Sequence, residues 1–155
     1  TVMTKFIFAV ALLVGACGGS DGDDGPTLDG LWQLETSNGC VATFNFKGNK
    51  WTDNAICELE SGNYGVEIES GALGRTSDTL DFVPQESSCP AHAHTSSAGY
   101  SFPAGQLALR FSNATLVFNK VSGGGKLPDG AVIANGCWDF SQSPARFTPG
   151  PVEQL

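Results

Sequence analysis

The stretch CVATFNFKGNKWTDNAIC, residues 40–57, decides the fold that we expect for this chain. Apolar and polar residues alternate on both sides of Gly48-Asn49, which is the pattern of two antiparallel strands joined by a two-residue turn. Glycine in the first turn position favours a type II′ turn, and the turn sets the register of the hairpin. Partner residues then have numbers that sum to 97: Phe46 faces Trp51, Phe44 faces Asp53, Ala42 faces Ala55 and Cys40 faces Cys57.

This register predicts a disulfide bond at the open end of the hairpin. Lys47 and Lys50 form the hydrogen-bonded pair beside the turn, and the two kinds of pair alternate along the strands. Cys40 and Cys57 are therefore a non-hydrogen-bonded pair. The Cα atoms of such a pair lie about 4.5 Å apart, which is close enough for a disulfide.

Alternation of the same kind continues along most of the chain. In NYGVEIES (63–70) we expect Tyr64, Val66 and Ile68 on the inner face and Glu67 and Glu69 on the outer face. Further strand-like segments are GLWQLE (30–35), SDTLDFV (77–83), GYSF (99–102), QLALRF (106–111) and ATLVFNKV (114–121). About eight short strands of this kind predict an all-β domain, an antiparallel up-and-down meander that closes into a small barrel.

The composition supports a strand-rich domain and argues against some classes of binding partner. The chain has 155 residues, 20 of them glycine and one methionine, which suits strands and turns better than helices. Its net charge is −8, without basic clusters. An acidic chain of this kind is not expected to bind nucleic acid, nor to be drawn to anionic lipid by charge.

The amino-terminal segment changes character at Cys17. Lys5 precedes an apolar run from Phe6 to Val14, which is too short to cross a bilayer and suits the core of a secretory signal. Residues 18–26 are instead rich in glycine and aspartate, and such a stretch cannot bury apolar surface. We therefore predict a signal peptide over 1–16 and a flexible tether over 17–27.

Val14-Gly15-Ala16-Cys17 resembles the lipobox of bacterial lipoproteins. The resemblance implies that the thiol of Cys17 receives a lipid and that the chain is cleaved before this residue. Several acyl chains give stable membrane anchoring. The expected location is the bacterial cell envelope, at the outer membrane or cell surface rather than the inner membrane. An ordinary signal peptide with a cysteine at its cleavage site is the alternative.

If Cys17 carries a lipid, four cysteines remain, and an even number in an exported chain suggests two disulfides. With Cys40 joined to Cys57, the remaining bond is Cys89–Cys137. Loop closure suggests stabilisation of about 3 and about 4 kcal/mol respectively. A metal site is the weaker alternative, because no two of these cysteines have the C-x-x-C spacing.

The segment from residue 28 to about 121 resembles small lipocalin-like bacterial lipoproteins. Gly30-Leu31-Trp32 matches the G-x-W that begins the first strand in that family, and Ser87-Ser88-Cys89-Pro90 matches a later element. The resemblance implies a barrel over 28–121 and an arginine stacked on the tryptophan. Many members of such families have no assigned activity, so the resemblance does not indicate a specific one. Arg110 is the nearest candidate for the arginine, although alternation points it outward. We expect the remaining residues, 122–155, to form an irregular strap over the barrel, held by Cys137.

The inward residues could line a pocket for a small apolar ligand or form an ordinary packed core. The candidate ligand-binding residues are Trp32, Phe44, Trp51, Asp53, Tyr64 and Phe82. Asp53 stands out, because a buried carboxylate is costly unless it is paired or close to solvent. We place it near an open end of the barrel.

His92 and His94 are the two histidines, and in a strand both would lie on one face. Glu86 is the nearest third metal ligand, but the segment resembles a solvated loop, so no metal or other cofactor is predicted. No serine lies in a nucleophile motif, and we expect no enzymatic activity. The sequence predicts a monomeric envelope lipoprotein that binds a small apolar ligand or an envelope protein. A structural lipoprotein with a filled core is the alternative, and a hydrolase is a third possibility.

Overall fold

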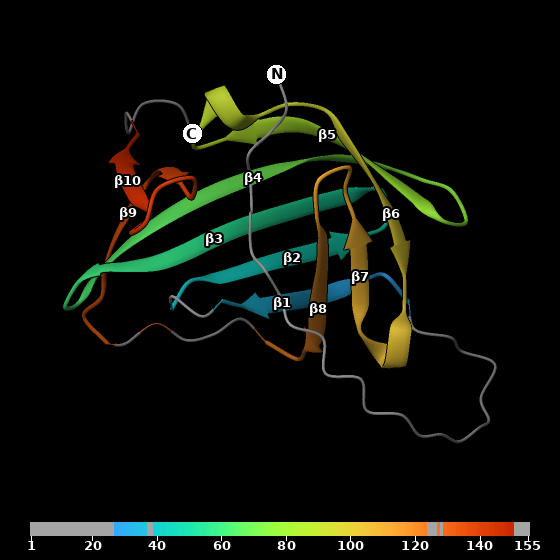
Figure 1. The fold of residues 1–155 in the computed structure, drawn as a ribbon, viewed down its shortest axis with the longest axis horizontal. Helices are drawn as coiled ribbons and strands as arrows, with labels where there is room; N and C mark the ends of the chain where they lie inside the picture. The colour runs from blue at the N-terminus through green and yellow to red at the C-terminus, as the bar shows by residue number, and fades with distance from the viewer. Residues whose placement is uncertain (1–26, 37–38, 124–126, 128, 151–155) are drawn as a thin grey trace.

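The computed structural model describes residues 27–36, 39–123, 127 and 129–150. The signal peptide and most of the tether expected from the sequence therefore lie outside the described residues. Figure 1 shows long strands on one side of the molecule and shorter ones on the other. The strands are β1 (Gly30–Glu35), β2 (Val41–Lys47), β3 (Lys50–Glu60), β4 (Asn63–Arg75), β5 (Thr79–Ser87), β6 (Ser96–Ser101), β7 (Leu107–Arg110), β8 (Thr115–Val121), β9 (Val132–Asp139) and β10 (Arg146–Pro149).

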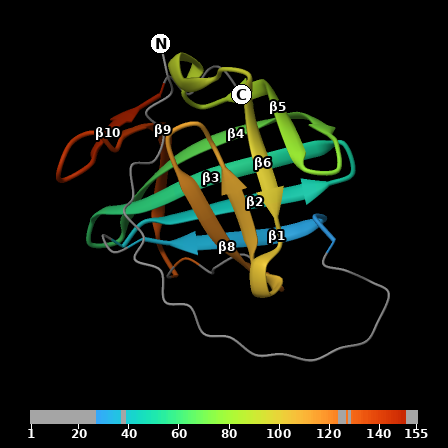
Figure 2. The same cartoon turned by 45° about the vertical axis from the view of Figure 1, so that its right-hand side comes forward.

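Strands β1 to β8 form a closed antiparallel barrel in which each strand pairs with the next along the chain. Pairing of β1 with β8, in which Trp32 faces Lys120, completes the circle. Figure 2 shows β6, β7 and β8 crossing in front of β1 to β4. The predicted up-and-down meander is therefore confirmed. In the described residues the helices are the single 3₁₀ turns η1 (Pro90–His92) and η2 (Pro103–Gly105), and no helix is long and apolar enough to span a bilayer.

The β2–β3 hairpin has the predicted register. Phe46 pairs with Trp51 and Phe44 with Asp53, so partner numbers sum to 97. Gly48 has a φ of 60°, whereas Asn49 has no positive φ, as a type II′ turn requires. The Cys40–Cys57 disulfide is present, with a Cα–Cα distance of 4.3 Å. The local pattern alone was sufficient for this part of the fold.

The barrel closes around Trp32, which is fully buried. Its indole N–H donates a hydrogen bond of 2.8 Å to the carbonyl of Leu28. The cation over the ring is Lys120, with its Nζ 5.2 Å from the ring centroid. Arg110, the candidate considered from the sequence, is exposed and donates to Ser101 instead. The alternation that pointed Arg110 outward was correct, and a lysine on β8 takes the position over the tryptophan.

A dense aromatic core fills the part of the barrel next to Trp32. Phe44 lies at its centre, with its ring centroid 5.4 Å from that of Phe118 and 5.8 Å from that of Phe82. The Trp51 ring meets Phe82 edge to face at 5.3 Å. Buried side chains from every strand of the barrel complete the cluster, including Phe46, Leu73, Leu80, Tyr100, Leu109 and Leu116.

The expected orientation of β4 is wrong. Glu67 and Glu69, predicted on the outer face, are buried with 6% and 3% of their surface exposed. A register shift between Glu58 and Glu60, at Leu59, is the physical reason. An extra residue in one strand of a pair reverses the faces that follow, so Glu67 lies opposite Ala55 and Tyr64 lies on the other face.

The carboxy-terminal segment is not an irregular strap. β9 pairs in parallel with the start of β4, and β10 pairs with the end of β9. Figure 1 shows both at the end of the barrel where β3 meets β4. Cys137 of β9 is bonded to Cys89, with a Cα–Cα distance of 5.0 Å, so the second predicted disulfide is also present.

Candidate functional site

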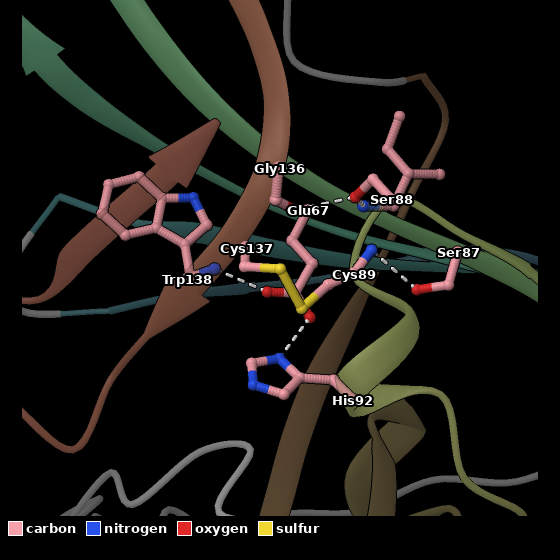
Figure 3. The surroundings of a disulfide bond; sticks show 9 residues. Glu67, Ser87, Ser88, Cys89, His92, Gly136, Cys137 and Trp138 are labelled. Carbon is pink, nitrogen blue, oxygen red and sulfur yellow. Dashed lines mark hydrogen bonds and ion pairs between the residues drawn. A yellow bond between two sulfur atoms is a disulfide. The ribbon is translucent and has the colours of Figure 1, made fainter. Parts of the chain in front are cut away.

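Glu67, one of the two buried charged residues in the described structure, lies at the junction between the barrel and the β9–β10 hairpin. We call Glu67, Cys89, His92, Cys137 and Trp138 the junction site (Figure 3). Glu67 comes from β4, Cys89 directly precedes the 3₁₀ turn η1 after β5, His92 ends that turn, and Cys137 and Trp138 come from β9. Segments far apart in sequence therefore supply the site.

Glu67 is the central residue of the junction site. Its Oε2 accepts a hydrogen bond of 2.7 Å from the backbone N–H of Trp138, and its Oε1 lies 3.0 Å from Nδ1 of His92. A buried carboxylate is costly unless hydrogen-bond donors compensate for lost hydration. The backbone of β9 and the imidazole of η1 provide such contacts. Because 36% of the His92 side chain is exposed, the pair lies between the interior and solvent.

Trp138 packs over the face of β4 that carries Glu67. Its indole N–H donates 2.9 Å to the carbonyl of Gly65, and its ring lies 4.9 Å from that of Phe147. A Cβ added to Gly65 would meet both rings at 2.8 Å, so the close approach requires glycine here. With Ala55 and the Cys40–Cys57 disulfide, Trp138 forms a second apolar cluster, separate from the aromatic core.

Ser87 and Ser88, which precede Cys89, form hydrogen bonds beside the Cys89–Cys137 disulfide. The hydroxyl of Ser88 donates 2.8 Å to the carbonyl of Gly136 and accepts 2.9 Å from the N–H of Ile68. The N–H of Cys89 donates 3.0 Å to the hydroxyl of Ser87. Strands β4, β5 and β9 are thus linked by hydrogen bonds as well as by the disulfide.

Along β3 and β4, a row of carboxylates lies between the two apolar clusters. Glu69 pairs with Asp53 across β3 and β4, and Glu67 follows Glu69 on the same face. Asp53 lies opposite Phe44, as predicted, and is half-buried. Alternation alone assigned the glutamates to the wrong face. The shift at Leu59, invisible in that pattern, is what brings them together with Asp53.

The structure divides the predicted ligand-binding residues into three groups. Trp32, Phe44, Trp51 and Phe82 belong to the aromatic core. Asp53 lies in the carboxylate row between the clusters, and Tyr64 is half-buried on the opposite face of β4. The six residues are therefore not gathered around one site.

The two histidines also have different surroundings. His94 is exposed, whereas His92 contacts the buried Glu67, so the expectation of a wholly solvated loop is wrong for His92. The nearest acidic residue is Glu67, not Glu86. Cys89 and His92 are three residues apart, and this C-x-x-H spacing is the sequence signal that could have drawn attention to the site.

The negative charge around His92 also includes Asp139 at the end of β9. Hydrogen bonds from the hydroxyl and the backbone N–H of Ser141 lower the pKa of the Asp139 carboxyl, with a smaller contribution from the nearby His92. Asp139 thus adds a second acidic residue near the imidazole, outside the junction site itself.

No protein-family model, curated protein or solved structure matches this chain. Its function is therefore inferred from the sequence and from the geometry above.

Proposed function

We propose that this protein is a lipid-anchored binding module of the bacterial cell envelope, without catalytic activity, that binds an envelope partner through its outer surface. A closed barrel with two disulfides is a rigid scaffold for such a role. The lipobox-like segment and the glycine- and aspartate-rich tether support a domain held near a membrane.

The observation that carries this choice is the packing of the aromatic core. Phe44 and Phe46 are stacked at 5.5 Å, and Phe118 meets Phe44 edge to face at 5.4 Å. Trp32 and Phe118 have no exposed surface. A small apolar ligand in this part of the barrel would have to displace rings that already pack against one another. This favours contact at the surface over carriage inside.

Exposed apolar side chains near the β3–β4 turn support the surface role. Val132 and Ile133 at the start of β9 are 61% and 53% exposed, and Leu59 at the end of β3 is 41% exposed. The N–H of Val132 donates 2.8 Å to the carbonyl of Gly62, so the start of β9 adjoins the β3–β4 turn that follows Leu59. Exposed apolar groups gathered in one place are typical of interaction sites.

The test is crosslinking of the full-length, lipidated protein in its own envelope. A photoreactive residue in place of Ile133 should form a crosslink to a partner of defined mass. The same residue in place of Val83, an exposed apolar position on β5, should not. Native mass spectrometry of the purified protein gives the second measurement.

Two results would contradict the surface role. Crosslinks of equal yield from positions 133 and 83, or from neither, would mean that the exposed start of β9 has no specific partner. A lipid-sized mass that remains bound to the single chain would place the ligand inside the barrel instead.

A further inference from the structure

The junction site holds two sulfur atoms, an imidazole and a carboxylate within a small volume. The 3₁₀ turn η1 begins after Cys89 and ends at His92, whose N–H donates 2.9 Å to the carbonyl of Cys89. Side chains three residues apart in a 3₁₀ turn lie on the same side. The turn therefore directs the Cys89 sulfur and the His92 ring toward the same region.

The distances define a set of potential metal ligands. A carboxylate oxygen of Glu67, Sγ of Cys89 and a ring nitrogen of His92 all lie within 4.8 Å of one another. Sγ of Cys137 is bonded to Sγ of Cys89 and so belongs to the same group. While the disulfide exists, neither sulfur can bind a metal, because a thiolate is the required ligand.

We propose that the Cys89–Cys137 pair, once reduced, forms a tetrahedral zinc site with His92 and Glu67. A dithiol reductant supplies two electrons and two protons, which break the S–S bond and leave two thiols and the oxidised reductant. Zinc then binds the two sulfurs as thiolates, and the two thiol protons are released to solvent. The inference is independent of the proposed binding partner.

The chemistry of the ligand set favours zinc over other cations. Two thiolates, an imidazole and a carboxylate are the ligand types found in tetrahedral zinc sites, whereas calcium and magnesium prefer oxygen. Zinc bonds of about 2.0–2.3 Å place ligand atoms about 3–4 Å apart. The ligand atoms of Glu67, Cys89 and His92, all within 4.8 Å of one another, therefore need to approach by at most about 1–2 Å, whereas the two sulfurs need to move apart once their bond is broken. The N–H of Trp138 on Oε2 of Glu67 orients the carboxylate while Oε1 remains on the side of His92.

The consequence is a site with two exclusive states. Under oxidising conditions the disulfide joins β9 to the end of β5. Under reducing conditions zinc joins the same two cysteines and adds η1 and β4 through His92 and Glu67. The β9–β10 hairpin stays attached in both states. The protein takes up zinc when reduced, and a disulfide oxidant that accepts two electrons from the two thiolates re-forms the S–S bond and releases Zn²⁺.

The experiment uses the full chain with Cys17→Ser, so that a free thiol at that position does not contribute. The protein is reduced with a phosphine, desalted without oxygen and titrated with Zn²⁺ against a chromophoric chelator. Co²⁺ in place of zinc reports thiolate ligands by charge-transfer absorption. We expect one zinc per reduced chain and none on the oxidised chain.

Variants distinguish this site from other thiols. Cys40→Ser with Cys57→Ser removes the other disulfide and should leave zinc binding unchanged, whereas Cys89→Ser with Cys137→Ser should abolish it. His92→Ala changes a partly exposed side chain and should weaken zinc binding at least about tenfold, given that even groups behind the ligands contribute about 10–100-fold.

Three outcomes would overturn the proposal. The first is no zinc on a reduced chain whose near-ultraviolet circular dichroism is native. The second is zinc binding equal to the parent protein in the Cys89→Ser, Cys137→Ser variant or in His92→Ala. The third is a reduced chain that unfolds and does not recover its native spectrum when zinc is added.

Discussion

At the scale of single residues, Lys120 shows how one side chain completes the barrel. Its ammonium lies 5.2 Å from the centre of the buried Trp32 ring and donates 3.3 Å to the carbonyl of Thr27. Lysine stems can cover apolar surface while the charge stays hydrated. Lys120 thus covers the Trp32 ring at the place where β1 pairs with β8.

We expect Lys120→Met to lower the free energy of unfolding by about 0.5–1 kcal/mol, the usual range for an exposed cation over an aromatic ring. Urea unfolding followed by tryptophan fluorescence measures the change. Lys120→Arg should retain most of the stability, and Lys47→Met, at an exposed position on β2, serves as the control. Equal losses in Lys120→Met and Lys47→Met would mean that the contact with Trp32 contributes nothing.

At the scale of elements, the turn between β9 and β10 is organised by Asp139. The carboxylate accepts hydrogen bonds from the hydroxyl and the N–H of Ser141, and a further one from the side chain of Gln142. These donors favour the ionised form and lower the pKa of Asp139 from its ordinary value of 3.8. Because the folded pKa is below the unfolded pKa, ionised Asp139 stabilises the turn above the unfolded value. That contribution is lost as the pH falls through the folded pKa.

We expect Ser141→Ala to raise the pKa of Asp139 toward 3.8, because it removes the hydroxyl that contributes most to the shift. Carboxyl ¹³C chemical shifts measured through an acid titration give this pKa directly. Gln142→Ala should raise it less, since the Gln142 side chain contributes less. A pKa that is unchanged in Ser141→Ala would show that the turn does not hold the carboxylate as described.

The β3–β4 pair shows which element-scale features a pattern cannot reveal. Without an extra residue, the turn at Ser61-Gly62 would place Tyr64, Val66 and Ile68 on the inner face, as the alternation predicts. The shift at Leu59 changes the sum of partner numbers from 123 at Glu60 and Asn63 to 122 at Glu58 and Tyr64. One residue therefore decides whether tyrosine and isoleucine or the two glutamates face inward.

At the scale of the whole molecule, the protein has two apolar clusters on the inner face of one sheet system, with carboxylates between them. The first cluster closes the barrel, and the second attaches the carboxy-terminal hairpin. The Cys40–Cys57 disulfide belongs to the second cluster, and the Cys89–Cys137 disulfide lies beside it, next to Trp138. On β3, Cys57 lies toward the end of the strand, whereas Trp51 of the aromatic core lies near its start. The covalent bonds thus reinforce the part of the structure that the large aromatic core does not reach.

Attachment of the whole protein to a membrane is predicted to depend on Cys17, which lies outside the described residues. Cys17→Ser should move the protein from the membrane fraction to the soluble fraction of cells, because no thiol remains to receive the lipid. Cell fractionation and the mass of the mature amino-terminal peptide check this result. Unchanged membrane retention, or an unprocessed amino terminus, would reject the anchor.

The features that depend on neighbouring residues could be predicted from local pattern. A two-residue turn and strict alternation were enough to set the β2–β3 register and so the Cys40–Cys57 bond. The Cys89–Cys137 bond then followed by elimination. Three contacts became known only from the folded chain: Lys120 covers Trp32, β9 pairs with β4 in parallel, and Glu67 contacts His92. These contacts join segments far apart in the chain, and a single bulged residue selects which face of β4 takes part, so local periodicity carries no information about them.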